Sequence, residues 1–225
     1  MRLPLFVHTI VACSQVTYLW PAVIEVVNVS DMIGGSLPHT YFEEISDYAI
    51  GMLHEFNATG ADMNDDFFQW QQTRQVQRSS TWQRMNSSIA YQSVVEFVTS
   101  AAKRYVSMTN PKEMDKLTMI SWASVQQEGG YHAVHTHTGD AVVCVLYARV
   151  NHLSGNLMFH DPRGYNPPFG RTRIHPVQTG QLILFPSWLP HSVLPTRGTD
   201  DYRVIFAFNF GSGTDDSADF QVQTS

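Results

Sequence analysis

Cysteine is scarce in this chain and long apolar runs are missing. The 225 residues contain two cysteines, Cys13 and Cys144, which are too few for a disulfide framework. Cys144 lies in the apolar run 141–146 and is predicted to be a small buried hydrophobic residue. No stretch reaches the roughly 18 to 20 apolar residues that a membrane span needs, so we expect no transmembrane segment.

An excess of positive charge is also missing. The formal net charge is -6 and the calculated pI is near 5.9, so the chain offers no long-range attraction for a polyanion. We therefore expect no nucleic-acid partner, and nothing in the sequence indicates an oligomeric state. A hydrophobic content of 43% with 12% aromatic residues is typical of a folded globular protein. Without an internal repeat or a long linker, a chain of this length predicts one shared core.

The first 17 residues have two interpretations. One basic residue, Arg2, followed by a short apolar stretch resembles a secretory or lipoprotein signal. His8 and Thr9 interrupt that stretch, which favours an extra or edge strand and a cytoplasmic protein. Secretion remains the alternative, and the glycosylation sequons would matter only there. These sequons begin at Asn28, Asn57 and Asn86.

Two segments in the first half of the chain have helical periodicity. Residues 37–56 and 87–108 carry apolar residues at spacings of three and four, which predicts amphipathic helices. The connection 60–88 is polar and rich in glutamine, and we predict it to be irregular. The apolar positions of the first helix are Phe42, Ile45, Ala49, Met52, Leu53 and Phe56, and those of the second are Ile89, Val94, Phe97, Val98, Ala101 and Tyr105.

The second half, from about residue 116, changes to short runs rich in β-branched and aromatic residues, separated by glycine and proline turns. Many short strands of this kind predict a sandwich or barrel. We therefore expect an α+β jelly roll with amino-terminal helices packed on one face, in one domain over 18–210 and a flexible tail over 211–225. The predicted strands are 116–126, 141–150, 156–159, 181–185 and 203–210.

Three histidines have a spacing suited to a metal site. His135 and His137 stand two positions apart on an extended segment, so their side chains project to the same face. His191, approached through two stiffening prolines, would arrive from a later strand. Such a set covers one side of a metal ion and leaves the other side open, as non-haem iron sites do for a cosubstrate and dioxygen. The pattern predicts these three residues as metal ligands and catalytic residues.

A candidate anion anchor follows the histidines. Arg203 opens a very apolar strand, where a guanidinium is costly unless it is paired. A guanidinium binds a carboxylate through two parallel hydrogen bonds, so Arg203 is suited to the distal carboxylate of a dicarboxylate cosubstrate that chelates iron. The hydroxyl groups of Tyr147 and Ser187 are weaker candidates to share that anion.

The order of these motifs resembles the 2-oxoglutarate and iron(II)-dependent oxygenases related to prolyl hydroxylases, and in particular a subgroup with DPR and FPSWLxHxVxP elements. The resemblance covers about 20–210 and is specific from Trp122 onward. It implies a double-stranded β-helix (a cupin-like jelly roll), hydroxylation of an unidentified substrate with release of succinate and CO2, and a supporting role for ascorbate. It also implies Fe(II) ligation by His135, His137 and His191, with 2-oxoglutarate held by Arg203. The matching segments are His135–His137, Gly155–Arg163, Gly180–His191 and Arg203–Asn209.

One departure from the wider superfamily leaves alternatives open. The commoner triad has an aspartate or glutamate where this chain has His137, so Asp140 could supply a carboxylate, or His137 could support another ligand from behind. A three-histidine cupin dioxygenase that does not use 2-oxoglutarate is a second enzymatic interpretation. A non-catalytic metal-binding or ligand-binding jelly roll is a third.

Several further residues are weaker candidates. On a regular strand His132 would face away from His135, and we expect it to contact substrate or support a ligand at most. Either His160 or Asp161 is expected to point into the cavity, and Arg163 is expected to be a structural clamp on a loop carbonyl, with a substrate contact as the alternative. Aromatic residues that could shape access to the site, with 165–169 as a lid, are Tyr165, Phe169 and Trp188.

Overall fold

The computed structural model describes residues 14–19, 22–29, 37–57, 67–71, 80–137, 139–198 and 201–211. Its helices are α1 (His39–Asn57), α3 (Ser80–Ser87), α4 (Ile89–Thr109) and the 3-10 helix η2 (Pro111–Lys116). Its strands are β1 (Ser14–Leu19), β2 (Ala22–Asn28), β3 (Phe67–Gln71), β4 (Thr118–Gln126), β5 (His132–His135), β6 (Asp140–Arg149), β7 (Leu157–His160), β8 (Thr172–His175), β9 (Gln181–Pro186), β10 (His191–Val193) and β11 (Arg203–Gly211).

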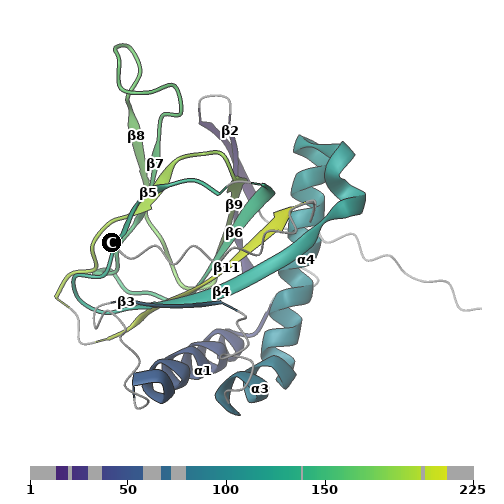
Figure 1. Cartoon of the computed structure of the whole chain (residues 1–225), viewed down its shortest axis with the longest axis vertical. Coiled ribbons are helices and arrows are strands. Elements are labelled where there is room, and N and C mark those ends of the chain that lie inside the picture. The colour runs from purple at the N-terminus through teal and green to yellow at the C-terminus, as the bar shows by residue number, and fades with distance from the viewer. Residues whose placement is uncertain are drawn as a thin grey trace, which may run out of the picture.

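The strands form two antiparallel sheets that face each other. A seven-stranded sheet has the order β1-β2-β9-β6-β11-β4-β3, and a four-stranded sheet has the order β5-β10-β7-β8. Figure 1 shows the helices on one side of the larger sheet and the smaller sheet on the other. This arrangement is the double-stranded β-helix with helices on one face, so the predicted fold class is confirmed.

Strict alternation along the strands of the larger sheet builds two cores. On β11, Val204, Phe206 and Phe208 pack with the helices, whereas Ile205 and Ala207 pack between the two sheets. Side chains of successive strand residues point to opposite faces, so the parity of a residue decides which core it joins. Arg203 and Asn209 have the same parity as Ile205 and therefore face the space between the sheets.

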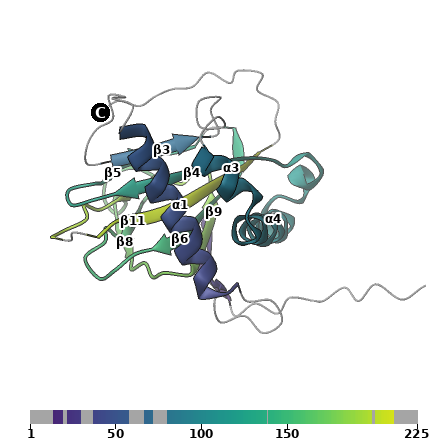
Figure 2. The same ribbon diagram turned by 90° about the horizontal axis from the view of Figure 1, so that it is seen from below.

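The two predicted amphipathic helices are present. The apolar stripe of α1 is buried at Phe42, Ile45 and Met52, and α1 runs across β4, β11 and β6 (Figure 2). Helix α4 begins after Ser88, whose hydroxyl accepts a hydrogen bond from the Tyr91 amide and so caps the helix. None of the helices in the described ranges is long and apolar enough to cross a membrane.

Some local predictions were wrong. The segment 60–88 is not wholly irregular, because Ser80–Ser87 forms α3 and Phe67–Gln71 pairs with β4. Ile89, placed on the apolar stripe from its spacing, is 74% exposed at the first position of α4. The short strands β8 and β10 carry too few residues for a periodic signal. Residues 1–13 and 212–225 lie outside the described residues, so the domain limits stay a prediction.

Candidate functional site

Three histidine rings converge between the two sheets. β10 pairs with β5 so that His191 lies opposite His135, and the centroids of these two rings are 4.3 Å apart. His137 follows β5, and its ring centroid lies 5.1 Å from that of His135 and 5.2 Å from that of His191. One ligand nitrogen from each ring lies within 4.8 Å of the other two. Nitrogen atoms gathered this closely can bind one metal ion.

Backbone carbonyl groups fix the protonation of two of the rings. The Nδ1 of His135 lies 2.8 Å from the Ala133 carbonyl oxygen, and the Nδ1 of His191 lies 2.9 Å from the Leu189 carbonyl oxygen. A carbonyl oxygen only accepts, so each Nδ1 carries the proton and donates it. The Nε2 of both rings therefore keeps its lone pair for a metal, as is usual for ligating histidines.

Asn209 on β11 contacts the third histidine. Its Nδ2 lies 2.9 Å from Nδ1 of His137 and 2.7 Å from Oδ2 of Asp140, while its Oδ1 is buried without a partner. Metal ligation through Nε2 of His137 requires a proton on Nδ1. Turning the Asn209 amide over lets Oδ1 accept that proton, and Oδ1 then faces Asp140. In that orientation Asp140 would have to be protonated to donate to Oδ1; burial raises the pKa of this carboxyl, and its hydrogen bond with Asn209 lowers it.

Burial keeps His137 and His191 neutral. Desolvation, followed by the charge of His135, lowers the pKa of His137 to about 4, and the same two causes hold the pKa of His191 well below its ordinary value. Neutral imidazole is the metal-binding form, so both rings are ready to coordinate at neutral pH. Asp140 is not part of the group of converging ligand atoms, and its Oδ2 lies against the Asn209 amide instead.

His132 faces the site, contrary to the expectation from a regular strand. The β5–β10 pairing has an irregularity that sets four residues of β5 against three of β10, because Val193 lies opposite His132 while His191 lies opposite His135. The extra residue returns both side chains to the same face, and their ring centroids are 5.9 Å apart. Burial, followed by the charge of Arg203, lowers the pKa of His132 to about 3.

Arg203 is a buried cation with unsatisfied donors. Only 1% of the residue is exposed, and no carboxylate in the described part of the chain pairs with its guanidinium. Nη1 donates to Oε1 of Gln126 at 2.9 Å, whereas Nε and Nη2 are buried and have no partner among the described residues. A buried guanidinium stays charged, and leaving it uncompensated costs several kcal/mol. The group is therefore suited to bind an anion that enters the barrel.

Tyr147 and Ser187 have different surroundings. The Arg203 guanidinium carbon lies 5.5 Å from the centre of the Tyr147 ring, and the buried Tyr147 hydroxyl has no partner. The Ser187 hydroxyl instead donates to the Asp140 carbonyl oxygen, and the Ser187 carbonyl accepts from the His137 amide. Tyr147 can therefore share an anion with Arg203. Ser187 instead links the end of β9 to the segment from His137 to Asp140.

The remaining sequence candidates do not join the histidines. Phe159 packs between the sheets, so His160 faces the other side of β7 and bonds Ser192 at 2.9 Å. Asp161 receives two hydrogen bonds from the Arg163 side chain, each 2.9 Å long, and the Arg163 guanidinium lies 4.4 Å from the Phe169 ring centre. His160 and Asp161 therefore have partners outside the histidine group, and Arg163 has the expected structural role, although it binds the Asp161 carboxylate rather than a loop carbonyl. This interaction stiffens the β7–β8 hairpin, which projects from the barrel in Figure 1.

Exposed aromatic side chains stand on the loops after β7 and β9. Tyr165 is 76% exposed, Phe169 39% and Trp188 47%. Trp188 lies between β9 and β10, three residues before His191, so it is the nearest of these along the chain to the converging histidines. The proposed lid over 165–169 stays a prediction.

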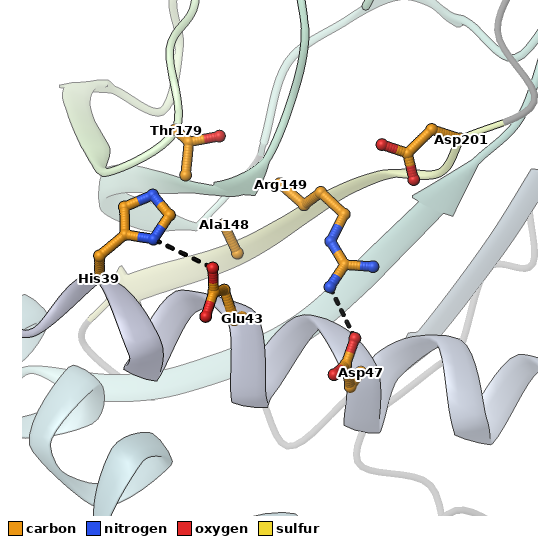
Figure 3. A pocket seen from close by; sticks show the side chains of 7 residues that line it. All are labelled: His39, Glu43, Asp47, Ala148, Arg149, Thr179 and Asp201. Atoms are coloured by element: carbon orange, nitrogen blue, oxygen red, sulfur yellow. Dashed lines mark hydrogen bonds and ion pairs between the residues drawn. The ribbon is translucent and has the colours of Figure 1, made fainter.

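A second hollow, of about 340 Å³, lies on the helix side of the larger sheet. Its charged groups largely satisfy one another, because His39 pairs with Glu43 at 3.4 Å and Arg149 with Asp47 at 2.6 Å (Figure 3). Ala148 at its floor belongs to the helix-facing core. The larger sheet separates this hollow from the histidines, and we assign no function to it.

The sequence comparisons agree with this site. Residues 120–209 match the family model described as "Putative 2OG-Fe(II) oxygenase". This range begins in β4, ends in β11, and includes all three histidines and Arg203. No curated protein matches the chain.

Solved structures share the fold at low sequence identity. A prolyl-4-hydroxylase from Pseudomonas putida is 13% identical with a TM-score of 0.52, covering 84% of this chain and 91% of that one. AviO1 from Streptomyces viridochromogenes is 11% identical with a TM-score of 0.55, covering 79% and 87%. SnoN, an alpha-ketoglutarate-dependent epimerase of nogalamycin biosynthesis, is 12% identical with a TM-score of 0.51, covering 85% and 76%.

Proposed function

We propose that the chain is a 2-oxoglutarate and iron(II)-dependent oxygenase, in which His135, His137 and His191 hold the iron while Arg203 and Tyr147 hold 2-oxoglutarate; the family match over 120–209 supports this. The observation that carries the proposal is the presence of two half-sites in the space between the sheets, with His135 and His191 on the smaller sheet and Arg203 and Tyr147 on the larger sheet. One half-site presents imidazole nitrogens, and the other presents buried donors without an acceptor. A dicarboxylate with a chelating end and an anionic end complements both.

The residues of the chain fit the two groups. The Nε2 lone pairs of His135 and His191 are made available by their Nδ1 bonds to carbonyl groups, and three imidazoles leave coordination positions for a cosubstrate. The buried Nε and Nη2 of Arg203 can bind a carboxylate in the way that Arg163 binds Asp161. When bound, iron and 2-oxoglutarate together supply the oxidising chemistry that inserts oxygen into a substrate C–H bond, with release of succinate and CO2.

The chain itself contributes position and shelter. Trp122 lies beside His137 with ring centroids 5.8 Å apart, and Phe185 packs against His191 at 4.7 Å. These aromatic walls hold the two imidazoles and exclude water from that side of the site, which protects an oxidising centre from side reactions. The exposed aromatic residues Tyr165, Phe169 and Trp188 are proposed to control access of the primary substrate, whose identity we leave open.

The test is turnover without a primary substrate. The purified protein with Fe(II), ascorbate and oxygen should release succinate slowly from 2-oxoglutarate, and omission of either iron or oxygen should stop the release. Oxygen consumption that needs no 2-oxoglutarate would instead support the three-histidine cupin dioxygenase. No turnover combined with tight zinc binding would support a non-catalytic metal-binding protein.

Two further proposals concern the substrate class and the location of the protein. We propose that the substrate is not a nucleic acid, which the net charge of -6 supports. We also propose a cytoplasmic location, which the buried free thiol of Cys144 is compatible with.

A further inference from the structure

Gln126 is the side chain that determines how Arg203 presents its donors. The two residues lie opposite each other on β4 and β11, and Oε1 of Gln126 accepts from Nη1 of Arg203 at 2.9 Å. Gln126 is fully buried, so the bond is shielded from water. Because the amide occupies Nη1, the edge formed by Nε and Nη2 is the one left for a ligand.

The equivalent edge of another arginine binds a carboxylate elsewhere in this chain. Arg163 uses its own Nε and Nη2 to contact both oxygens of Asp161, each at 2.9 Å. The amide nitrogen of Gln126 is a further donor, since Nε2 is buried and without a partner. Four donors at this wall therefore lack an acceptor within the described ranges: Nε and Nη2 of Arg203, the Tyr147 hydroxyl and Nε2 of Gln126.

We infer that Gln126 is a positioning residue that makes the site select a 2-oxoacid with a second, distal carboxylate, an inference that rests on the proposed function. Its neutral amide orients the guanidinium without neutralising it. A glutamate of the same shape would form a buried ion pair with Arg203 and compete with the ligand for the same charge. Glutamine at this position thus reserves the charge of Arg203 for an incoming anion.

The experiment compares two ligands that share one end. 2-Oxoglutarate and pyruvate both carry the 2-oxoacid group, and only 2-oxoglutarate carries the distal carboxylate. Dissociation constants of both are measured by calorimetry on protein loaded with Mn(II), which takes oxygen and nitrogen ligands as Fe(II) does and keeps turnover out of the measurement. The variants are Gln126→Glu and Gln126→Met, and the control is Gln127→Glu, which adds the same charge at the neighbouring position on the strand boundary.

Gln126→Glu should weaken 2-oxoglutarate by roughly ten- to a hundredfold, the scale of a lost charged hydrogen bond, and leave pyruvate within about twofold. Gln126→Met should produce a smaller loss in the same direction and serves as the test if the glutamate variant does not fold. Equal weakening of both ligands would mean general damage and would overturn the inference. Unchanged selectivity in both variants, with a wild type that prefers 2-oxoglutarate, would also overturn it and leave the proposed function standing. A wild type that binds no 2-oxoglutarate would overturn both.

Discussion

His191 lies directly opposite His135 in the β5–β10 pairing, and the Nδ1 of each ring bonds a carbonyl oxygen two residues before it in the chain. The same local hydrogen bond thus orients Nε2 of both rings toward the site. His191 is 4% exposed and is the most buried of the three proposed ligands.

His191→Ala should abolish stoichiometric metal binding. Two remaining imidazoles would hold a labile cation poorly, and we expect an affinity loss beyond the roughly hundredfold that removal of a supporting residue can cause. Anaerobic titration of the metal-free variant with Fe(II) measures the loss. His160→Ala removes a buried histidine that faces away from the site and should bind iron as the wild type does. Retained stoichiometric iron in His191→Ala would refute its assignment as a ligand.

Arg203→Ala should raise the concentration of 2-oxoglutarate needed for half-maximal succinate release while iron stays bound. The variant loses two charged hydrogen bonds to the distal carboxylate, so the increase should be roughly a hundredfold or more. Arg203→Lys keeps the charge but loses the parallel donors, so its 2-oxoglutarate requirement should lie between those of the wild type and Arg203→Ala. Arg197→Ala, on an exposed turn, is the control. An unchanged requirement in Arg203→Ala would remove this residue from the site.

The sequence was sufficient for the parts of this site that follow from local periodicity. The two-residue spacing of His135 and His137, the parity of Arg203 on an apolar strand and the helical spacing of α1 each predict a direction for a side chain without tertiary information. His132 could not be placed in this way, because its inward orientation arises from a mismatch with the three-residue strand β10. Gln126 could not be predicted either, since its contact with Arg203 depends on a strand register that only the folded sheet defines. Asn209 was within reach, because it shares the parity of Arg203.

Gly155→Ala should destabilise the protein strongly. An added Cβ would overlap the Leu194 carbonyl oxygen and meet the Leu194 carbonyl carbon at 2.8 Å, so backbone would have to move in the segment that follows β10. We expect a loss of about 3 kcal/mol or more in the free energy of unfolding.

Urea unfolding measures this loss, provided that the unfolding free energy of each variant depends on urea concentration with the same slope. Gly164→Ala is the matched control, since a Cβ there meets nothing within 4 Å and the positive φ of 91° alone costs about 1–2 kcal/mol. A Gly155→Ala variant no less stable than Gly164→Ala would show that the close approach to Leu194 is not limiting.

Acid should destabilise the metal-free protein through His132. Its pKa is lowered from 6.5 to about 3, so below pH 6.5 the unfolded chain takes up a proton that the folded chain refuses. The stability contributed by the neutral ring is present above pH 6.5 and declines as the pH falls toward 3, by at most about 1.4 kcal/mol per pH unit.

Urea unfolding at pH 7, 6 and 5 tests this dependence. His132→Gln should remove up to one proton from the uptake on unfolding, and so make the decline in stability less steep. His152→Gln shows the effect of removing an exposed histidine. A decline equally steep in wild type and His132→Gln would mean that His132 does not couple folding to protons.

Asn209→Ala should weaken metal binding without removing a ligand. Asn209 is the side chain that contacts Nδ1 of His137, and loss of such a supporting contact typically lowers metal affinity by roughly ten- to a hundredfold. If His137 ligates through Nε2, the contact that matters is acceptance of the Nδ1 proton by an oxygen. Asn209→Asp keeps such an oxygen and should recover most of the affinity, whereas Asn209→Leu, which matches the volume and has no acceptor, should not. Competition titration with a chromophoric chelator orders the three variants. Equal affinities for the aspartate and leucine variants would show that Asn209 only fills space beside His137.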